Sequence, residues 1–362
     1  MSTLSWASHS EPGRDQRAAD LEMNATDVSG IDATRITAWL AAHLTGVRPP
    51  LRFEFISGGR SNLTYKVIDA AGQCWVLRRP PLGHVLESAH DMGREFRILR
   101  AIGQTDVPVP VAFGLCTDPA VNGAPFYVMS FVDGVVLQAP EDAEVLSAAD
   151  RFRLAWQVVD ILARLHSVDP DRVGLGDLGR KEEYIARQLR RWAKQWASSR
   201  QRELPIMDEL HQSLARAIPR QHRATIVHGD YRLGNMLTRG GDVLAVLDWE
   251  LCTLGDPLAD VGYLLNNWVA PGEPVIAAGG PTAAGGFGSR NEIIARYAQA
   301  TGSDLSHIDY YRAFSYWRLA VISEGIYARY RHGAMGDRPD TDPEFFRERV
   351  EHLAEAARAL VR

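Results

Sequence analysis

The sequence predicts an α+β protein of two parts, a β-rich N-terminal region followed by a mainly helical C-terminal region. Before about residue 133, apolar and polar side chains alternate in short runs, which is the period of a β-strand. After about residue 145, apolar side chains recur every three or four positions, which is the period of a helix. The chain has 362 residues, enough for two domains or one large two-lobed domain.

The N-terminal region is expected to hold a small antiparallel sheet with one helix between its strands. A short amphipathic helix over residues 32–44 precedes the sheet, with Ile36 and Leu40 on its apolar face. The order after it is β-β-β-α-β-β, with a helix over 90–102 and strands over 51–59, 63–69, 73–80, 107–115 and 124–134. This order is typical of an antiparallel sheet covered by a helix.

The C-terminal region is expected to be helical except for one compact β segment over residues 224–257. Helices are predicted after Ser147 and over 181–217, 258–268, 289–300 and 309–332. A loop rich in Gly, Pro and Ala covers residues 271–288. We therefore divide the chain into a flexible N-terminal tail (1–30), an N-lobe (31–133) and a C-lobe (134–362).

Composition narrows the class of protein without naming its chemistry. Lys and Arg number 40 against 45 Asp and Glu, a formal charge of −5 that gives no electrostatic reason for a nucleic-acid or membrane partner. Cys74, Cys116 and Cys252 are far apart and form no CxxC pair, which argues against a disulfide framework and a zinc cluster. The first residues lack the apolar core of a signal peptide, so we expect a cytoplasmic protein.

Two glycine-rich segments are candidates for phosphate-binding loops. Gly174-Leu-Gly176-Asp-Leu-Gly179 matches the dinucleotide fingerprint, but it follows a helix and a turn, so an oxidoreductase is only a distant alternative. The other segment lies between two strands, where free backbone N–H groups can approach phosphate oxygens. It consists of Ser57, Gly58, Gly59, Arg60, Ser61 and Asn62.

The compact β segment carries the strongest chemical pattern. Asp230 precedes Asn235 by five residues, and an apolar run then leads to Asp248. An Asn amide and a carboxylate suit Mg²⁺, which keeps several waters and binds substrate phosphates. A separate carboxylate before the Asn can orient a hydroxyl nucleophile. The spacing is that of a kinase catalytic loop with a downstream metal-binding Asp.

The segment HGDYRLGNML…VLDWELCTLGDPLADVGYLL resembles the signature of the aminoglycoside phosphotransferase and choline kinase-like family. It is similar in particular to the kinase-like domains associated with acyl-CoA dehydrogenases. The resemblance covers roughly residues 30–350 and implies the two-lobed protein-kinase-like fold. It also implies transfer of the ATP γ-phosphate, with Mg²⁺, to a hydroxyl of a small molecule.

The resemblance assigns roles within the C-lobe. Asp230 resembles the catalytic base, and Asn235 and Asp248 resemble the Mg²⁺ ligands. His228 and Asp260 resemble structural supports of the catalytic loop. For Glu250, contact with the metal or with the acceptor is left open.

The N-lobe is expected to bind the nucleotide. Protein kinases carry a phosphate-binding Lys on the third strand, where this chain has Arg78 and Arg79. Strand alternation places Arg78 on the face of Val76, which would contact adenine, so Arg78 is the phosphate-binding candidate and Glu95 its helix partner. The segment joining the lobes, whose backbone would meet adenine, is Met129, Ser130 and Phe131.

The acceptor is less defined than the reaction. Residues 180–202 hold eight Lys or Arg against Glu182 and Glu183, which favours an anionic acceptor, such as a hydroxy acid or hydroxyacyl-CoA, over a polycationic aminoglycoside. The alternative is a catalytically silent pseudokinase that binds nucleotide. ATP and GTP are not distinguished by these patterns, and neither is the oligomeric state.

Overall fold

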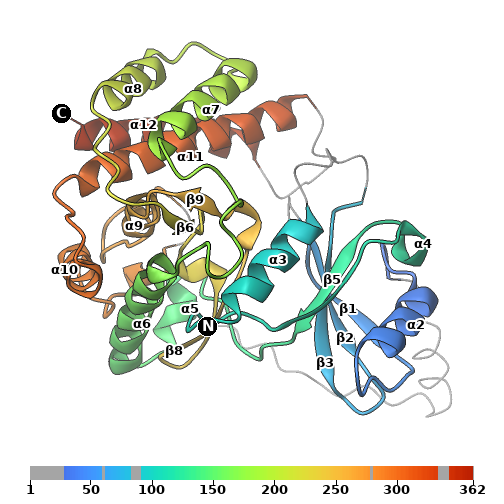
Figure 1. The fold of residues 1–362 in the computed structure, drawn as a ribbon. Coiled ribbons are helices and arrows are strands. Elements are labelled where there is room, and N and C mark those ends of the chain that lie inside the picture. The colour runs from blue at the N-terminus through green and yellow to red at the C-terminus, as the bar shows by residue number, and fades with distance from the viewer. Residues whose placement is uncertain (1–27, 59–61, 83–90, 278–279, 333–341, 362) are drawn as a thin grey trace, which may run out of the picture. The chain divides into compact units, whose positions relative to one another are not determined.

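The computed structural model describes residues 28–58, 62–82, 91–277, 280–332 and 342–361 (Figure 1). The chain divides into two compact units. The first comprises Met1–Phe96 and Val111–Phe131, and the second Arg97–Pro110 and Val132–Arg362. Within the described residues, no helix combines the length and apolarity that a membrane crossing requires.

The first unit is built on a five-stranded antiparallel sheet in the order β1-β2-β3-β5-β4. The strands are β1 (Arg52–Gly58), β2 (Leu63–Ile68), β3 (Cys74–Arg79), β4 (Ala112–Cys116) and β5 (Phe126–Ser130). Where the structure describes this unit, the helices that accompany them are α2 (Ala33–His43), α3 (Met92–Ile102), whose last residues belong to the second unit, and α4 (Pro119–Asn122).

One face of this sheet is covered by α2 (Figure 1). Ile36 and Leu40 of α2 are buried in one apolar core with Val67 of β2 and Leu77 of β3. Because successive strand residues point to opposite faces, Leu77 and Arg79 share the α2 face. Arg78 therefore faces the other way. This alternation fixes which arginine of β3 reaches which site.

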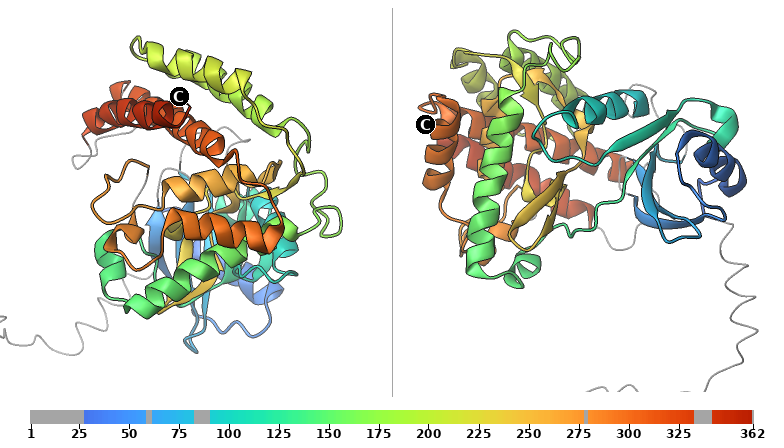
Figure 2. Two further views of the ribbon diagram at one scale, coloured as in Figure 1. Left: turned by 90° about the vertical axis from the view of Figure 1, so that its left-hand side faces the viewer. Right: turned by 60° about the horizontal axis from the view of Figure 1, so that its bottom comes forward.

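The second unit is mainly helical. Its helices are α5 (Pro140–Glu144), α6 (Ala148–Ser167), α7 (Tyr184–Ser199), α8 (Pro205–Arg216), α9 (Leu258–Asn266), α10 (Arg290–Thr301), α11 (Ile308–Arg331) and α12 (Pro343–Leu360). Three short 3₁₀ helices are η2 (Leu233–Asn235), η3 (Trp249–Leu251) and η4 (Pro281–Ala284). The long helices α11 and α12 lie side by side (Figures 1 and 2).

Two small antiparallel pairs hold the predicted catalytic segments. β6 (Thr225–Val227) pairs with β9 (Thr253–Gly255), and β7 (Met236–Arg239) pairs with β8 (Asp242–Val246). Residues 228–235 connect β6 to β7, and residues 247–252 connect β8 to β9. The two connections are held together because Leu247 N–H donates to the Asn235 carbonyl at 2.8 Å.

The α+β prediction is confirmed, as are the predicted helices that became α2, α6 and α10. The capping box at Ser289 and Glu292 is present at the start of α10. Residues 181–217 form two helices, α7 and α8, because Pro205 starts a new helix at its first position. The one-turn helices α4 and α5 were not predicted, since they are too short to show an apolar period, and α12 was also missed.

Candidate active site

The catalytic loop begins directly after β6 with His228, Gly229 and Asp230. Gly229 has φ +85°, and a Cβ there would lie 2.9 Å from the carbonyl oxygen of Leu251. An L-residue is strained at this φ and would collide with the neighbouring connection. Glycine is therefore needed for the loop to pass close to the segment that follows Asp248.

Asp260, on the first turn of α9, braces this loop. Its carboxylate accepts the backbone N–H groups of His228 at 2.7 Å and Gly229 at 2.8 Å. It also lies 3.3 Å from Nε2 of His166 on α6. Burial alone would raise the pKa of Asp260, but the hydrogen bonds and the nearby His side chains lower it below its ordinary value. The buried carboxylate is thus ionised, and each of its oxygens accepts a backbone hydrogen bond.

His228 is part of the loop's architecture. Its ring is fully buried, Nδ1 accepts the Asp230 backbone N–H at 3.2 Å, and Nε2 donates to the Leu247 carbonyl at 2.9 Å. These partners assign the proton to Nε2. Both ring nitrogens are engaged by the backbone, so the ring holds the loop to the Asp248 connection. The supporting role that the sequence suggested for His228 stays a prediction.

Asp230 and Asn235 lie at the two ends of the loop. The Asn235 side-chain nitrogen donates to the Asp230 carbonyl at 2.8 Å, which turns the amide oxygen away from this bond. The Asp230 carboxylate lies 3.5 Å from Nε of Arg232. Burial and the negative charge of Asp230 together raise the pKa of Tyr263 on α9. Asp230 therefore sits beside a cation and a neutral phenol.

Asp248 follows β8 in the left-handed region, with φ +65°, and caps η3. Such a conformation costs about 1–3 kcal/mol for a non-glycine residue. The turn is fixed by the Trp249 indole, whose Nε1 donates to the Val246 carbonyl at 3.0 Å. Glu250 lies on the same 3₁₀ turn and is partly buried.

The oxygen ligands here suit a Mg²⁺ ion that is bound partly by water and phosphate, rather than a metal ion that is held entirely by protein side chains. Within the described ranges, no group of three or more His, Cys, Asp or Glu side chains could hold a metal ion. Mg²⁺ does not need such a group, because it keeps several waters and takes substrate phosphates as ligands. An Asn amide oxygen and the Asp248 carboxylate match that chemistry, and the Leu247–Asn235 backbone bond joins the two segments that carry them.

In the first unit, three side chains contact Glu95 of α3. Arg78 Nε lies 3.1 Å from it, Asn62 Nδ2 donates to it at 2.7 Å, and the Tyr127 hydroxyl donates at 3.0 Å. Glu95 is only 3% exposed. This cluster orients Arg78 through a buried carboxylate. Sequence reasoning did not single out Tyr127, although it stands opposite Arg78 in the β3–β5 register.

The other residues predicted to bind the nucleotide share fewer contacts with one another. Val76 and Met129 are both buried and stand opposite each other on β3 and β5. Ser130 accepts the Val111 N–H at 2.9 Å, and the Lys66 ammonium lies 4.4 Å from the Phe131 ring centre. Ser57 and Gly58 end β1. Gly59, Arg60 and Ser61 lie outside the described residues.

Two residues that support the catalytic loop were missed by the sequence reasoning. Arg318 on α11 is buried and donates from Nη2 to the Gly229 carbonyl at 2.8 Å. Its guanidinium also lies 5.3 Å from the centre of the Tyr263 ring. His166 is held from its other side by the Tyr297 hydroxyl at 2.7 Å. The sequence carried no signal for them, since nothing local links these positions to the catalytic loop.

The Gly174–Gly179 segment does not have the setting of a dinucleotide site. It lies between α6 and α7, with a turn rather than a strand before it. Arg97 pairs with Asp177 and donates to the Gly174 carbonyl at 2.5 Å. The segment is therefore a loop, as the context of the motif indicated.

The fold and the catalytic-loop geometry define a kinase-like aminoglycoside phosphotransferase fold. The family model of the phosphotransferase enzyme family (APH) matches residues 52–297, and the chain belongs to this family. A crystal structure from Ralstonia eutropha JMP134, provisionally described as an aminoglycoside phosphotransferase, is 36% identical with a TM-score of 0.78. The match covers 91% of this chain and 98% of that chain.

Two curated relatives are longer than this chain. Acyl-CoA dehydrogenase family member 10 of Mus musculus is 38% identical over 80% of this chain and 27% of its own length. Family member 11 of Homo sapiens is 32% identical over 91% of this chain and 43% of its own length. The chain thus spans less than half of either relative. A streptomycin–ATP complex of APH(2")-IIa, 16% identical with a TM-score of 0.57 over 88% of this chain and 99% of that chain, shares the fold.

Proposed function

We propose that the protein is an ATP- and Mg²⁺-dependent O-phosphotransferase that acts on a hydroxyl of a small molecule. The observation that carries this proposal is the braced loop that places Asp230 and Asn235 next to the Asp248 connection. Membership of the phosphotransferase enzyme family supports it. A neighbour of the same fold is a complex with ATP, which supports nucleotide use without deciding between ATP and GTP.

Each residue then has a separate task. Asp230 aligns the acceptor hydroxyl by accepting its hydrogen bond, and the Arg232 guanidinium lies beside this carboxylate at 3.5 Å. Asn235 and Asp248 hold Mg²⁺, which neutralises charge on the nucleotide phosphates. Arg78, oriented by Glu95, binds phosphate oxygens through its guanidinium. Catalysis in this scheme comes mainly from positioning and charge neutralisation.

The acceptor is proposed to be an anionic hydroxy acid or hydroxyacyl-CoA. The curated relatives are acyl-CoA dehydrogenase family members, which supports a thioester-linked acceptor. The excess of Lys and Arg over residues 180–202 supports an anionic acceptor less strongly than the number of basic residues suggests. Lys181 is paired with Asp171, and Arg202 with the buried Glu324. An aminoglycoside acceptor remains the competing substrate class.

The test combines binding with product mass. MgATP should raise the melting temperature of the wild type and of Asp230→Asn, but not of Asp248→Asn, because of these two aspartates only Asp248 is assigned to the metal. Phosphate transfer to a panel of hydroxyacyl-CoAs, hydroxy acids, choline-like alcohols and aminoglycosides should fall about 100-fold or more in Asp230→Asn.

The outcomes separate the enzyme from its alternative. Stabilisation by MgATP without any product of added phosphate mass would favour the silent pseudokinase. Turnover that survives in Asp230→Asn would contradict the role given to that carboxylate. Absence of any MgATP stabilisation in the wild type would refute both.

A further inference from the structure

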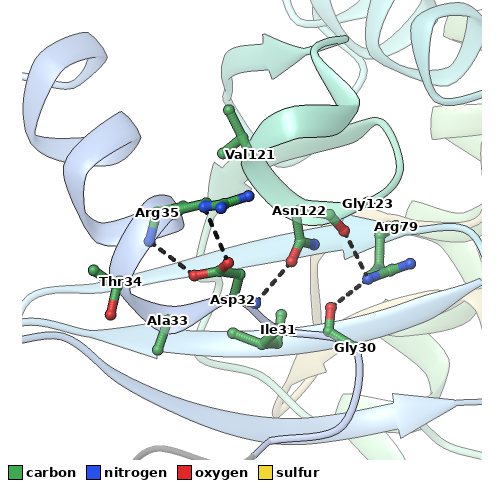
Figure 3. Close-up of a pocket in the computed structure, with 10 residues that line it drawn as sticks. All are labelled: Gly30, Ile31, Asp32, Ala33, Thr34, Arg35, Arg79, Val121, Asn122 and Gly123. Atoms are coloured by element: carbon green, nitrogen blue, oxygen red, sulfur yellow. Dashed lines mark hydrogen bonds and ion pairs between the residues drawn. The ribbon is translucent and has the colours of Figure 1, made fainter.

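A pocket of about 550 Å³ lies on the α2 face of the first unit (Figure 3). It is lined by the start of α2, by Arg79 at the end of β3 and by Asn122 of α4. Figure 3 shows Arg35 beside Asp32, and Asn122 on the side nearer Arg79. The proposed nucleotide residues do not line it. Arg78 lies on the opposite face of the same strand, with Glu95.

Arg79 is a buried cation that has no carboxylate partner among the described residues. Its side chain is 6% exposed, and it donates to the carbonyls of Pro80 at 3.2 Å, Asn122 at 3.3 Å and Gly30. Over the described residues, no carboxylate lies within 4.0 Å of its guanidinium, whereas Arg78 next to it has Glu95. Burial lowers the pKa of Arg79, as expected for a charge that lacks a counter-ion. Buried charges are ordinarily paired.

Asn122 adds an unused donor to the same pocket. It is 7% exposed, and its Oδ1 accepts the Asp32 backbone N–H at 2.9 Å. Its Nδ2 is buried and has no hydrogen-bond partner in the part of the chain that the structure describes. A buried amide nitrogen without an acceptor costs about 1–3 kcal/mol.

The pocket also includes the first turn of α2. Ala33 and Thr34 line it, and backbone N–H groups at such positions have no partner within their helix. Of the described residues that line the pocket, Asp32 is the one acidic residue, and its carboxylate is engaged by Arg35, at 3.0 Å from the backbone N and 3.5 Å from Nε. Two arginines and one aspartate leave the lining with a positive excess.

We propose that this pocket binds a small oxyanion, a phosphate or carboxylate group, between Arg79, Asn122 and the first turn of α2. The oxyanion supplies the counter-ion that Arg79 lacks and the acceptor that Asn122 Nδ2 lacks. The site is separate from the one proposed for the nucleotide, because Arg78 and Arg79 point to opposite faces of β3. Arg78 and Arg79 can therefore be substituted separately, and each substitution tests one proposed site.

The test measures binding of inorganic phosphate to the full chain by calorimetry at constant ionic strength, with acetate and sulfate as parallel probes. Phosphate should bind the wild type and the control Arg52→Gln, an exposed arginine outside both sites, alike, and about tenfold more weakly to Arg79→Gln, since a charge-assisted hydrogen bond is lost. Stabilisation by MgATP, in contrast, should be lost in Arg78→Gln and kept in Arg79→Gln. Acetate binding without phosphate binding would identify a carboxylate site.

A second variant protects the test against misfolding of Arg79→Gln. Asn122→Asp keeps the acceptor for the Asp32 N–H and places a carboxylate beside Arg79. It should abolish binding of all three probes and raise the melting temperature, because the buried guanidinium gains an internal counter-ion. No binding of any probe by the wild type, or unchanged binding in Asn122→Asp, would overturn the proposal.

Discussion

Replacing Asp260 by Asn should loosen the catalytic loop more than any single change within the loop itself. The carboxylate accepts backbone N–H groups of His228 and Gly229 at 2.7 and 2.8 Å, one on each oxygen. An Asn amide offers one oxygen only, so its NH₂ group must face one of the two backbone donors. One N–H then loses its partner and the other loses a charged acceptor. At about 1–3 kcal/mol for each of the two buried groups, the free energy of unfolding should fall by about 2–6 kcal/mol.

The pH dependence gives this prediction a second signature. The pKa of Asp260 is held below its ordinary value in the folded protein, so the ionised form stabilises the fold fully above the unfolded value of about 3.9. That stabilisation is lost as the pH falls through the lower, folded pKa. The stability difference between wild type and Asp260→Asn should therefore be constant near neutral pH and shrink in strong acid.

Urea unfolding followed by tryptophan fluorescence measures both effects. Asp309→Asn, an exposed aspartate that pairs with Arg312 at 2.9 Å, is the matched control and should change stability by less than about 0.5 kcal/mol. An Asp260→Asn protein as stable as this control, with MgATP binding intact, would refute the bracing role.

Three further changes test other parts of the structure. Gly229→Ala should lower the free energy of unfolding by about 1–3 kcal/mol, because φ is +85° and the new Cβ would lie 2.9 Å from the Leu251 carbonyl; thermal unfolding checks this. Glu324→Gln should cost about 1–3 kcal/mol in urea unfolding, because the fully buried Glu324 carboxylate, which pairs with the partly exposed Arg202 at 3.0 Å and accepts the Gln201 N–H, becomes a neutral amide. Glu95→Gln should weaken MgATP binding about tenfold in calorimetry by releasing Arg78; unchanged affinity would contradict the pairing argument.

The sequence predicted those features that local spacing determines. Alternation along β3 separated Arg78 from Arg79, and the five-residue spacing placed Asp230 and Asn235 at the ends of one loop. Strand and helix periods recovered the α+β class because each period extends over several residues. These inferences need no knowledge of distant contacts.

Long-range partners could not be predicted in the same way. The support of Asp260 by His166 joins positions 94 residues apart, and Arg318 reaches Gly229 over 89 residues. A buried arginine or histidine inside a helical pattern looks the same whether it binds a loop or pairs with a neighbour. Only the packing of α6, α9 and α11 decides which of these it does.

The contacts that hold the proposed metal ligands do not depend on a ligand. Asp248 adopts a left-handed conformation that costs about 1–3 kcal/mol. The bonds that offset this cost are internal: Trp249 to the Val246 carbonyl, Leu247 to the Asn235 carbonyl, and the His228 ring to the Leu247 carbonyl. Because these bonds form on folding, the arrangement is set without a ligand, and in the proposed reaction little reorganisation is left. Strain at Asp248 is thus maintained by the same network that braces the Asp230 loop.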